Sequence, residues 1–140
     1  MKIDIICVSR MRSKHQLELI DSYLKRMTWK INIREIDPRK NEEKQFLSMI
    51  KPDSALIALD EKGKNLTSIE FAKKIEATQN KQIQFLIGGA DGLQSEIKAK
   101  ANLSISFGQL TWPHMLVRIM LTEQLYRAQQ ILAGHPYHRE

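Results

Sequence analysis

The sequence has a single cysteine, Cys7, and no apolar run that approaches the ~20 residues of a membrane-spanning helix. One cysteine excludes an internal disulfide, which fits a cytosolic protein. The chain opens on a strand-like run at 2–8 and has neither the charged segment nor the cleavage site of a secretory signal. We therefore expect a cytosolic protein in which Cys7 packs in the core, since no neighbour in sequence would activate its thiol.

Low-complexity segments and internal repeats are missing as well. Hydrophobic residues are 42% and charged residues 27%, which is the balance of a folded globular protein and not of a disordered one. A chain of 140 residues fits one domain, because single domains most often have roughly 100–150 residues. We predict a single domain over residues 1–140.

Acidic residues are fewer than basic ones, with 16 Asp and Glu against 22 Lys and Arg, so the net charge is +6. A basic surface favours a polyanionic partner, most often nucleic acid. The densest basic stretch contains Arg10, Arg12 and Lys14 and follows the first predicted strand. It either contacts phosphates or forms a solvated loop, and charge alone does not separate these interpretations.

Short apolar runs alternate with longer stretches of helical periodicity along the whole chain. This alternation predicts an α/β fold with a largely parallel sheet flanked by helices. Ligands in such sheets bind at the carboxyl ends of the strands, here after Leu59, Ile87 and Phe107. The predicted strands are 2–8, 31–36, 54–59, 83–87 and 103–107, and the predicted helices are 13–28, 41–50, 68–79, a short one after Gly92, and 112–133.

A glycine-rich segment, Gly88-Gly89-Ala90-Asp91-Gly92, connects a predicted strand to the short helix. Its glycines permit positive φ and a close approach of backbone to a ligand. The segment matches neither a dinucleotide-binding fingerprint nor a Walker A loop, so a Rossmann domain is not expected. It is either a ligand-binding loop or a tight strand-to-helix turn.

The segment from Ser106 to His114 links the last predicted strand to the longest helix. Gly108 ends the strand, Thr111 is a candidate helix cap, and Pro113 fits a first helical turn. Few charges occur in this loop, so its backbone groups are candidates to contact a flat heterocycle. The alternative is a plain connection in which the tryptophan packs.

Titratable side chains concentrate near the C-terminus. His114 and Arg118 share one helix face, and Arg118 is a candidate to reach a phosphate or a carboxylate, with an ordinary structural role as the open alternative. Glu123 and Arg127 have the spacing of an ion pair. The chain ends in His135-Pro136-Tyr137-His138-Arg139-Glu140, which is either a tail that stacks on bases and binds phosphate or a frayed end. No paired cysteines or acidic ligands accompany these histidines, so no metal site is expected.

Four motifs in this order resemble the RlmH family of the SPOUT methyltransferases. The resemblance spans essentially the whole chain and is strongest from residue 83 onward. A further similarity lies at 22–26 in the first helix. The motifs are Phe-Leu-Ile-Gly-Gly-Ala-Asp-Gly-Leu at 85–93, Leu-Thr-Trp-Pro-His-Met-Leu-Val-Arg at 110–118, Glu-Gln-Leu-Tyr-Arg-Ala at 123–128, and the terminal His-Pro-Tyr-His-Arg-Glu.

The resemblance implies a fold with a C-terminal trefoil knot, a homodimer, and a methyl donor, S-adenosylmethionine, that becomes S-adenosylhomocysteine. It implies a substrate too: a pseudouridine in helix 69 of 23S ribosomal RNA, methylated at N3 on the assembled 70S ribosome. Its expected cofactor-binding residues are Leu59, Gly88, Phe107, Gly108, Gln109, Leu110, Thr111 and Trp112.

Methylation at N3 requires that a proton leave the nitrogen, so a base or a stabilised anion is needed. His138 is the first candidate for the base and His114 the second. Arg118 and Arg139 are candidates to hold a phosphate or a developing anionic carbonyl. The expected RNA contacts are Arg10, Arg12, Lys14, Tyr137 and Arg139.

The sequence departs from the family at Ser9, where members commonly have glycine, and in a short region between the first helix and the third strand. Three alternatives stay open: an RNA-binding protein without enzymatic activity, a related methyltransferase that acts on transfer RNA, and a flavodoxin-like nucleotide binder. The long helix 112–133 is either a dimer interface or internal core.

Overall fold

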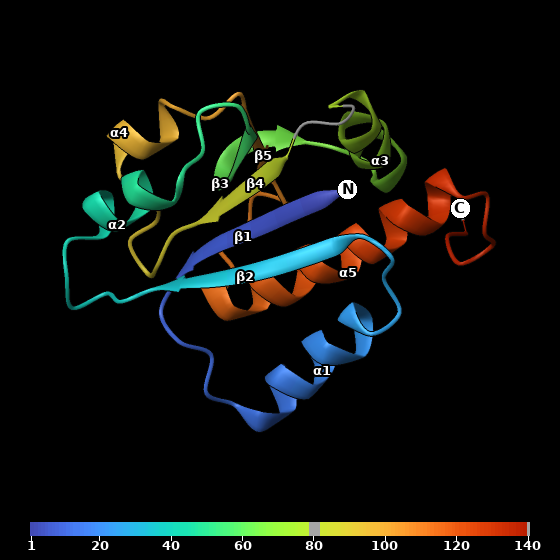
Figure 1. Ribbon diagram of the computed structural model, residues 1–140, viewed down its shortest axis with the longest axis horizontal. Coiled ribbons are helices and arrows are strands. Elements are labelled where there is room, and N and C mark those ends of the chain that lie inside the picture. The colour runs from blue at the N-terminus through green and yellow to red at the C-terminus, as the bar shows by residue number, and fades with distance from the viewer. Residues whose placement is uncertain (79–81, 140) are drawn as a thin grey trace.

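A computed structural model describes residues 1–78 and 82–139. Strands and helices alternate along the chain, as predicted (Figure 1). The elements are β1 Lys2–Val8, α1 Lys14–Leu24, β2 Lys30–Ile36, α2 Glu42–Met49, β3 Ala55–Asn65, α3 Ser68–Ala77, β4 Ile83–Ile87, α4 Ser95–Lys98, β5 Leu103–Ser106 and α5 His114–Leu132.

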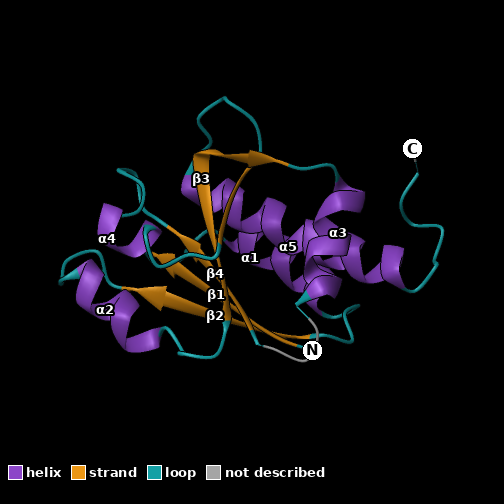
Figure 2. Cartoon of the chain, turned by 90° about the horizontal axis from the view of Figure 1, so that it is seen from above, coloured by secondary structure: helices purple, strands orange, loops and turns teal. Residues whose placement is uncertain are grey.

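The strands form one five-stranded sheet in the order β2-β1-β4-β3-β5, and every pairing is parallel. Phe85 of β4 lies between Ile5 of β1 and Ile57 of β3, which fixes the register at the centre. Helices α1, α3 and α5 cover one face, and α2 and α4 cover the other (Figure 2). The carboxyl ends of β3, β4 and β5 therefore meet at one edge of the sheet.

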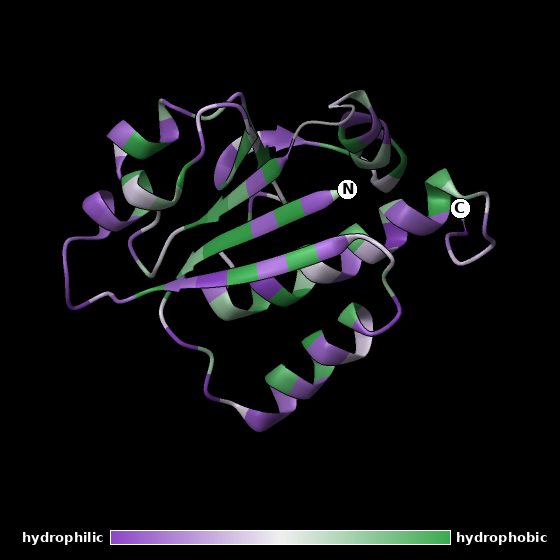
Figure 3. Cartoon of the chain, viewed as in Figure 1, coloured by the Kyte–Doolittle hydropathy of each residue, from purple (hydrophilic) through white to green (hydrophobic). Residues whose placement is uncertain are grey.

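The central strands are buried on both faces. Side chains of β1 alternate between the two layers, since successive residues of a strand point to opposite sides. Ile5 and Cys7 pack toward α3 and α5, whereas Ile6 and Val8 pack toward α2 and α4. Figure 3 shows that β1 and β4 are mainly hydrophobic. Burial on both faces explains why these strands read as near-continuous apolar runs.

Side-chain caps begin three of the helices. Ser13 and Asn41 cap α1 and α2, and each accepts a hydrogen bond from a first-turn backbone N–H. Thr67 and Glu70 form a capping box at the start of α3: the Glu70 amide donates to Thr67 Oγ1 at 3.1 Å, and the Thr67 amide donates to Glu70 Oε1 at 2.9 Å. These contacts satisfy backbone donors that a helix leaves unpaired.

Several boundaries differ from the prediction, among them the end of α1 at Leu24 where residue 28 was expected, and two of the differences bear on the strand ends. Strand β3 does not end at Leu59 but continues to Asn65, with a shift of its pairing to β5 between Leu59 and Lys64. Gly63 permits this, because a Cβ there would lie 2.7 Å from the Ile105 carbonyl carbon. Helix α5 begins at His114, one residue after the proline expected in its first turn, and Thr111 does not cap it.

Candidate functional site

A cavity of about 350 Å³ opens at the sheet edge where β3, β4 and β5 end; we call it the strand-end pocket. Its walls come from the end of β3, the glycine-rich loop, the β5–α5 loop and the first turns of α5. Of the residues expected to hold a cofactor, all but Gln109 line it: Leu59, Gly88, Phe107, Gly108, Leu110, Thr111 and Trp112. The three strand ends predicted from sequence therefore form one site.

The glycine-rich loop is both a tight turn and a pocket wall. A Cβ at Gly88 would lie 2.3 Å from the Gly92 carbonyl carbon, so no other residue fits without moving backbone. Gly92 has φ +76°, and its amide donates to the Gly89 carbonyl at 3.0 Å. The two interpretations of this segment are thus compatible, and Gly88 is needed for the turn itself.

The β5–α5 loop is held in shape by side-chain contacts. Ser106 Oγ accepts from the Gly108 amide at 3.1 Å, and Gly108 has φ +114°. Thr111 Oγ1 donates to Glu61 Oε2 at 2.8 Å, which ties this loop to the extension of β3. Leu110 is 73% exposed and Trp112 40% exposed, so two apolar side chains stand at the rim. Such a rim suits a flat apolar ring.

Charged residues that the sequence did not point to also line the pocket. Asp60, Glu61 and Lys62 come from the extension of β3, and Lys98 comes from α4. Lys98 Nζ lies 3.6 Å from the Asp60 carboxylate. Sequence reasoning missed them because the run 60–64 is polar and resembles a loop, although Gly63 marked a possible close approach of two backbones.

His114 is the first residue of α5, lines the strand-end pocket and is half-buried. Burial lowers the pKa of its imidazole below the ordinary value, and the positive charge of Arg118 adds to the effect. Both causes disfavour the charged ring. Both effects therefore favour the neutral imidazole, which is the form able to accept a proton.

Arg118 is buried at 1% exposure and is not among the residues that line the pocket. Its guanidinium donates to Glu35 Oε2 at 2.7 Å and to the carbonyls of Val8 at 3.3 Å and Ser9 at 2.9 Å. Of the two expected targets, phosphate or carboxylate, it reaches a carboxylate of its own chain. Arg118 thus fastens α5 to the end of β1 and to β2.

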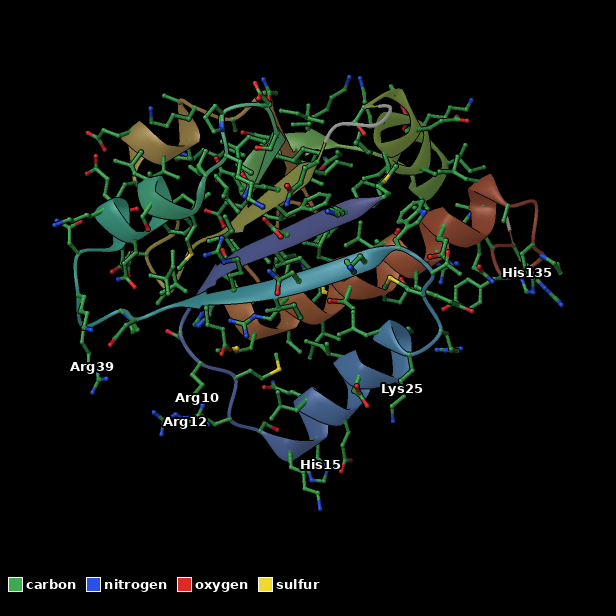
Figure 4. The ribbon with its side chains drawn as sticks, viewed as in Figure 1. Arg10, Arg12, His15, Lys25, Arg39 and His135 are labelled. Carbon is green, nitrogen blue, oxygen red and sulfur yellow. The ribbon has the colours of Figure 1, made fainter. Side chains whose placement is uncertain are left out.

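The basic loop between β1 and α1 is exposed. Figure 4 shows Arg10 and Arg12 extending from it into solvent, with His15 on the first turn of α1. Met11 between them is buried, and its amide donates to Glu35 Oε2 at 2.7 Å. The backbone of this loop is anchored while the side chains of Arg10, Arg12 and Lys14 stay accessible.

The C-terminal tail folds back onto α5. Tyr137 packs edge to face on Tyr126, with ring centroids 4.8 Å apart, and its hydroxyl donates to Glu123 Oε1 at 3.1 Å. The Arg127 guanidinium lies 4.8 Å from the centre of the Tyr137 ring, and its NH1 lies 3.0 Å from His138 Nδ1. Tyr137 is thus engaged within its own chain, whereas Arg139 is exposed.

His114 and His138 lie at opposite ends of α5. His138 contacts Arg127, which follows His114 by between three and four turns, roughly 20 Å at ~1.5 Å per residue. Figure 4 also shows His135 on the opposite side of the molecule from Arg10 and Arg12. Within one copy of the chain, the tail and the basic loop are therefore two separate surfaces.

A second, larger cavity of about 550 Å³ lies on the face covered by α1, α3 and α5. It shares the wall from Ile105 to Gly108 with the strand-end pocket. Tyr23, Met120 and Glu123 line its far side.

In the residues that the structure describes, no group of three or more His, Cys, Asp or Glu side chains is placed to hold a metal ion. No helix in the described ranges has the length and apolar character of a membrane span.

The family model and the similar proteins that match this chain agree on one family. The family model described as "Predicted SPOUT methyltransferase" matches residues 1–138. A protein of Zymomonas mobilis named "Ribosomal RNA large subunit methyltransferase H" is 48% identical and is covered over 99% of its length by the whole chain. The protein of the same name from Rhodospirillum centenum is 42% identical, with 99% of each chain covered.

Solved structures share the fold at low sequence identity. A probable methylase family protein from Haemophilus influenzae has a TM-score of 0.64 at 14% identity, over 99% of this chain and 70% of its own. A putative RNA methyltransferase from Bacillus anthracis has a TM-score of 0.58 at 10% identity, over 99% and 98%. At these identities the likeness concerns the fold alone.

Proposed function

Because the chain belongs to the SPOUT methyltransferase family, we propose that it is a cytosolic S-adenosylmethionine-dependent enzyme that methylates the RNA of the large ribosomal subunit. The proposed target is N3 of a pseudouridine in helix 69 of 23S ribosomal RNA, reached on the assembled 70S ribosome. The full-length match to proteins named ribosomal RNA large subunit methyltransferase H, at 48% and 42% identity, carries this proposal.

The strand-end pocket fits the methyl donor by size and chemistry. A volume of about 350 Å³ falls within the ~300–1,000 Å³ of small-molecule sites. Leu110 and Trp112 offer apolar contact to an adenine ring, and the backbone groups of the loop from Phe107 to Thr111 supply hydrogen bonds. Asp60 and Glu61 place negative charge beside a donor that carries an ammonium and a sulfonium. When bound, that donor supplies an electrophilic methyl group.

The residues of the chain then hold the acceptor nucleotide in place and remove the proton from its N3 atom. His114 is our candidate base, because it lines the pocket and because burial lowers its pKa, which favours the neutral ring. It takes the proton from N3 of the pseudouridine, whose negative charge spreads onto the neighbouring carbonyl oxygens. Arg10, Arg12 and Lys14 hold RNA phosphates, and so does Arg139. Arg118 contributes by fixing the loop that carries the first two.

We also propose that two copies of the chain form the complete site. His114 and the tail residue His138 lie at opposite ends of α5, so one copy does not bring both to one acceptor. A second copy resolves this if its tail lies beside the first copy's pocket. Leu116 on α5 is 39% exposed and is a candidate contact, whereas Leu121 is fully buried within its own core. We propose in addition that the C-terminal segment of this chain forms the trefoil knot that the family resemblance implies.

Calorimetric titration with S-adenosylmethionine tests the pocket directly. Leu110→Ala removes an exposed rim side chain and should weaken binding about tenfold, since burying a leucine is worth ~1.5 kcal/mol or more. Leu47→Ala is a matched control, because Leu47 is 43% exposed on α2 and does not line the pocket. Absence of binding by the unmodified protein, or equal weakening by both variants, would contradict the assignment.

A further inference from the structure

Glu61 is a carboxylate of the strand-end pocket that the structure holds in place without a cation. Its Oε2 accepts from Thr111 Oγ1 at 2.8 Å, and both residues line the pocket, so the end of the side chain stays at the pocket wall. Among the residues that the structure describes, no Lys, Arg or His forms an ion pair with Glu61. Glu61 is exposed, and an exposed carboxylate is ionised at neutral pH.

The other charged groups that line the pocket largely offset one another. Asp60 and Lys98 are 3.6 Å apart, so their charges form a pair. Asp91 and Lys62 are both exposed and carry opposite charges. The imidazole in the lining is favoured in its neutral form by burial. Glu61 therefore supplies the negative charge that the lining has in excess, and it is the carboxylate whose position a hydrogen bond fixes.

The methyl donor and the product of the proposed reaction differ by one charge. S-adenosylmethionine carries a sulfonium, whereas the loss of its methyl group leaves a neutral thioether in S-adenosylhomocysteine. The adenosine, the ammonium and the carboxylate are the same in both molecules, so contacts to these groups bind donor and product alike. A fixed charge in the pocket distinguishes them, because the attraction between two unit charges persists over several ångströms at a protein surface.

We propose that Glu61 is a specificity-determining residue, which makes the strand-end pocket bind S-adenosylmethionine more tightly than S-adenosylhomocysteine. This inference rests on the proposed function. Because the Thr111 hydroxyl holds the carboxylate at the wall, the charge is in position before a ligand binds. Weaker binding of the neutral product favours its release and its replacement by a new donor molecule, a step that limits the turnover of many enzymes.

Calorimetric titrations with the donor and with the product, at low ionic strength, separate the charge of Glu61 from its hydrogen bond. Glu61→Gln removes the charge, but the amide oxygen of glutamine still accepts from Thr111. We expect this variant to bind S-adenosylmethionine about fivefold more weakly and S-adenosylhomocysteine with unchanged affinity. Thr111→Val removes the hydrogen bond and keeps the charge, so it should retain most of the preference for the donor.

Two controls test whether the effect is local and electrostatic. Glu96→Gln removes one negative charge from an exposed residue of α4 that does not line the pocket, and it should leave both affinities unchanged. Sinefungin, an analogue with an ammonium in place of the sulfonium, should follow the donor, and added salt should reduce the difference.

Equal weakening of donor and product by Glu61→Gln would overturn this inference alone, because damage to the loop acts on both ligands. If the unmodified protein bound neither ligand, the proposed function would be overturned together with it.

Discussion

The Arg118 guanidinium and the Glu35 carboxylate lie 2.7 Å apart and join α5 to β2 beneath the loop that follows β1. The same Glu35 oxygen accepts from the amide of Met11, and Arg118 also donates to the Ser9 carbonyl. One ion pair therefore sets the position of the loop that carries Arg10 and Arg12 relative to the helix that begins at the strand-end pocket.

Substitution of Arg118 and substitution of Glu35 should lower the free energy of unfolding by different amounts. Arg118→Met leaves Glu35 and two carbonyls without their donor and should lower the free energy of unfolding by about 3 kcal/mol, as for other broken buried pairs. Glu35→Gln should cost about 1 kcal/mol, because the amide oxygen of glutamine can still accept from the Arg118 guanidinium and from the Met11 amide, and only the negative charge is lost. Urea denaturation of both variants and of the double variant measures the coupling. If the losses of the two single variants add up to that of the double variant, the two residues are not coupled and the ion pair does not have the role described.

Ser9 adopts φ +76°, a left-handed conformation that costs a residue with a Cβ about 1 kcal/mol. Glycine has no such cost, although it gives up some conformational entropy on folding. Ser9→Gly should therefore raise the free energy of unfolding by up to about 1 kcal/mol. The hydrogen bond from the Ser9 amide to the Ile36 carbonyl at 2.8 Å is a backbone contact and should survive. A lower denaturation midpoint for Ser9→Gly than for the unmodified protein would refute the strain.

Burial raises the pKa of the Cys7 thiol to about 12. The reactive thiolate is therefore scarce at pH 8, and the side chain is 1% exposed. Alkylation by iodoacetamide should be slow in the native protein and should accelerate strongly in guanidinium chloride. Rapid labelling of the folded protein would mean that β1 opens or that Cys7 is not in the core.

The pH dependence of methyl transfer should follow His114. A base acts in its neutral form, so the rate rises as pH passes its pKa. Because burial lowers the pKa of His114, that rise should be centred below the ordinary value of about 6.5. His114→Ala should abolish the rise and slow single-turnover transfer by ~10²-fold or more, with cofactor affinity retained. An unchanged profile in His114→Ala would exclude it as the base.

Local pattern predicted the elements and the edge of the sheet where the pocket lies, because apolar periodicity and strand ends are encoded by neighbours in sequence. Long-range partners were not predictable in this way. Glu61 and Thr111 meet across the pocket only because β3 extends past Leu59, and polar residues at 60–65 give no strand signal. The partner of Arg118 lies on β2, a distant element whose register sets the contact.

The tail illustrates the same limit. Its composition left open whether it contacts RNA or is a frayed end, and the order of candidates for the base placed His138 before His114. We propose the reverse order, because His114 lines the strand-end pocket whereas His138 does not, and Arg127 NH1 lies 3.0 Å from His138 Nδ1. Neither relation follows from spacing. The family resemblance, in contrast, points to residues from three separate strand ends, such as Leu59, Gly88 and Phe107, which do line one pocket.

Transfer of labelled methyl groups from S-adenosylmethionine tests the central claim most directly. The purified protein is incubated with intact 70S ribosomes, isolated large subunits and bulk transfer RNA, and the modified nucleotide is mapped. We predict label at N3 of a helix 69 pseudouridine in intact ribosomes, and little in the other two substrates. Label in transfer RNA alone would contradict the proposed ribosomal substrate and would point to transfer RNA in its place. No label in any of the three substrates, together with no binding of the donor, would contradict the assignment as an RNA methyltransferase.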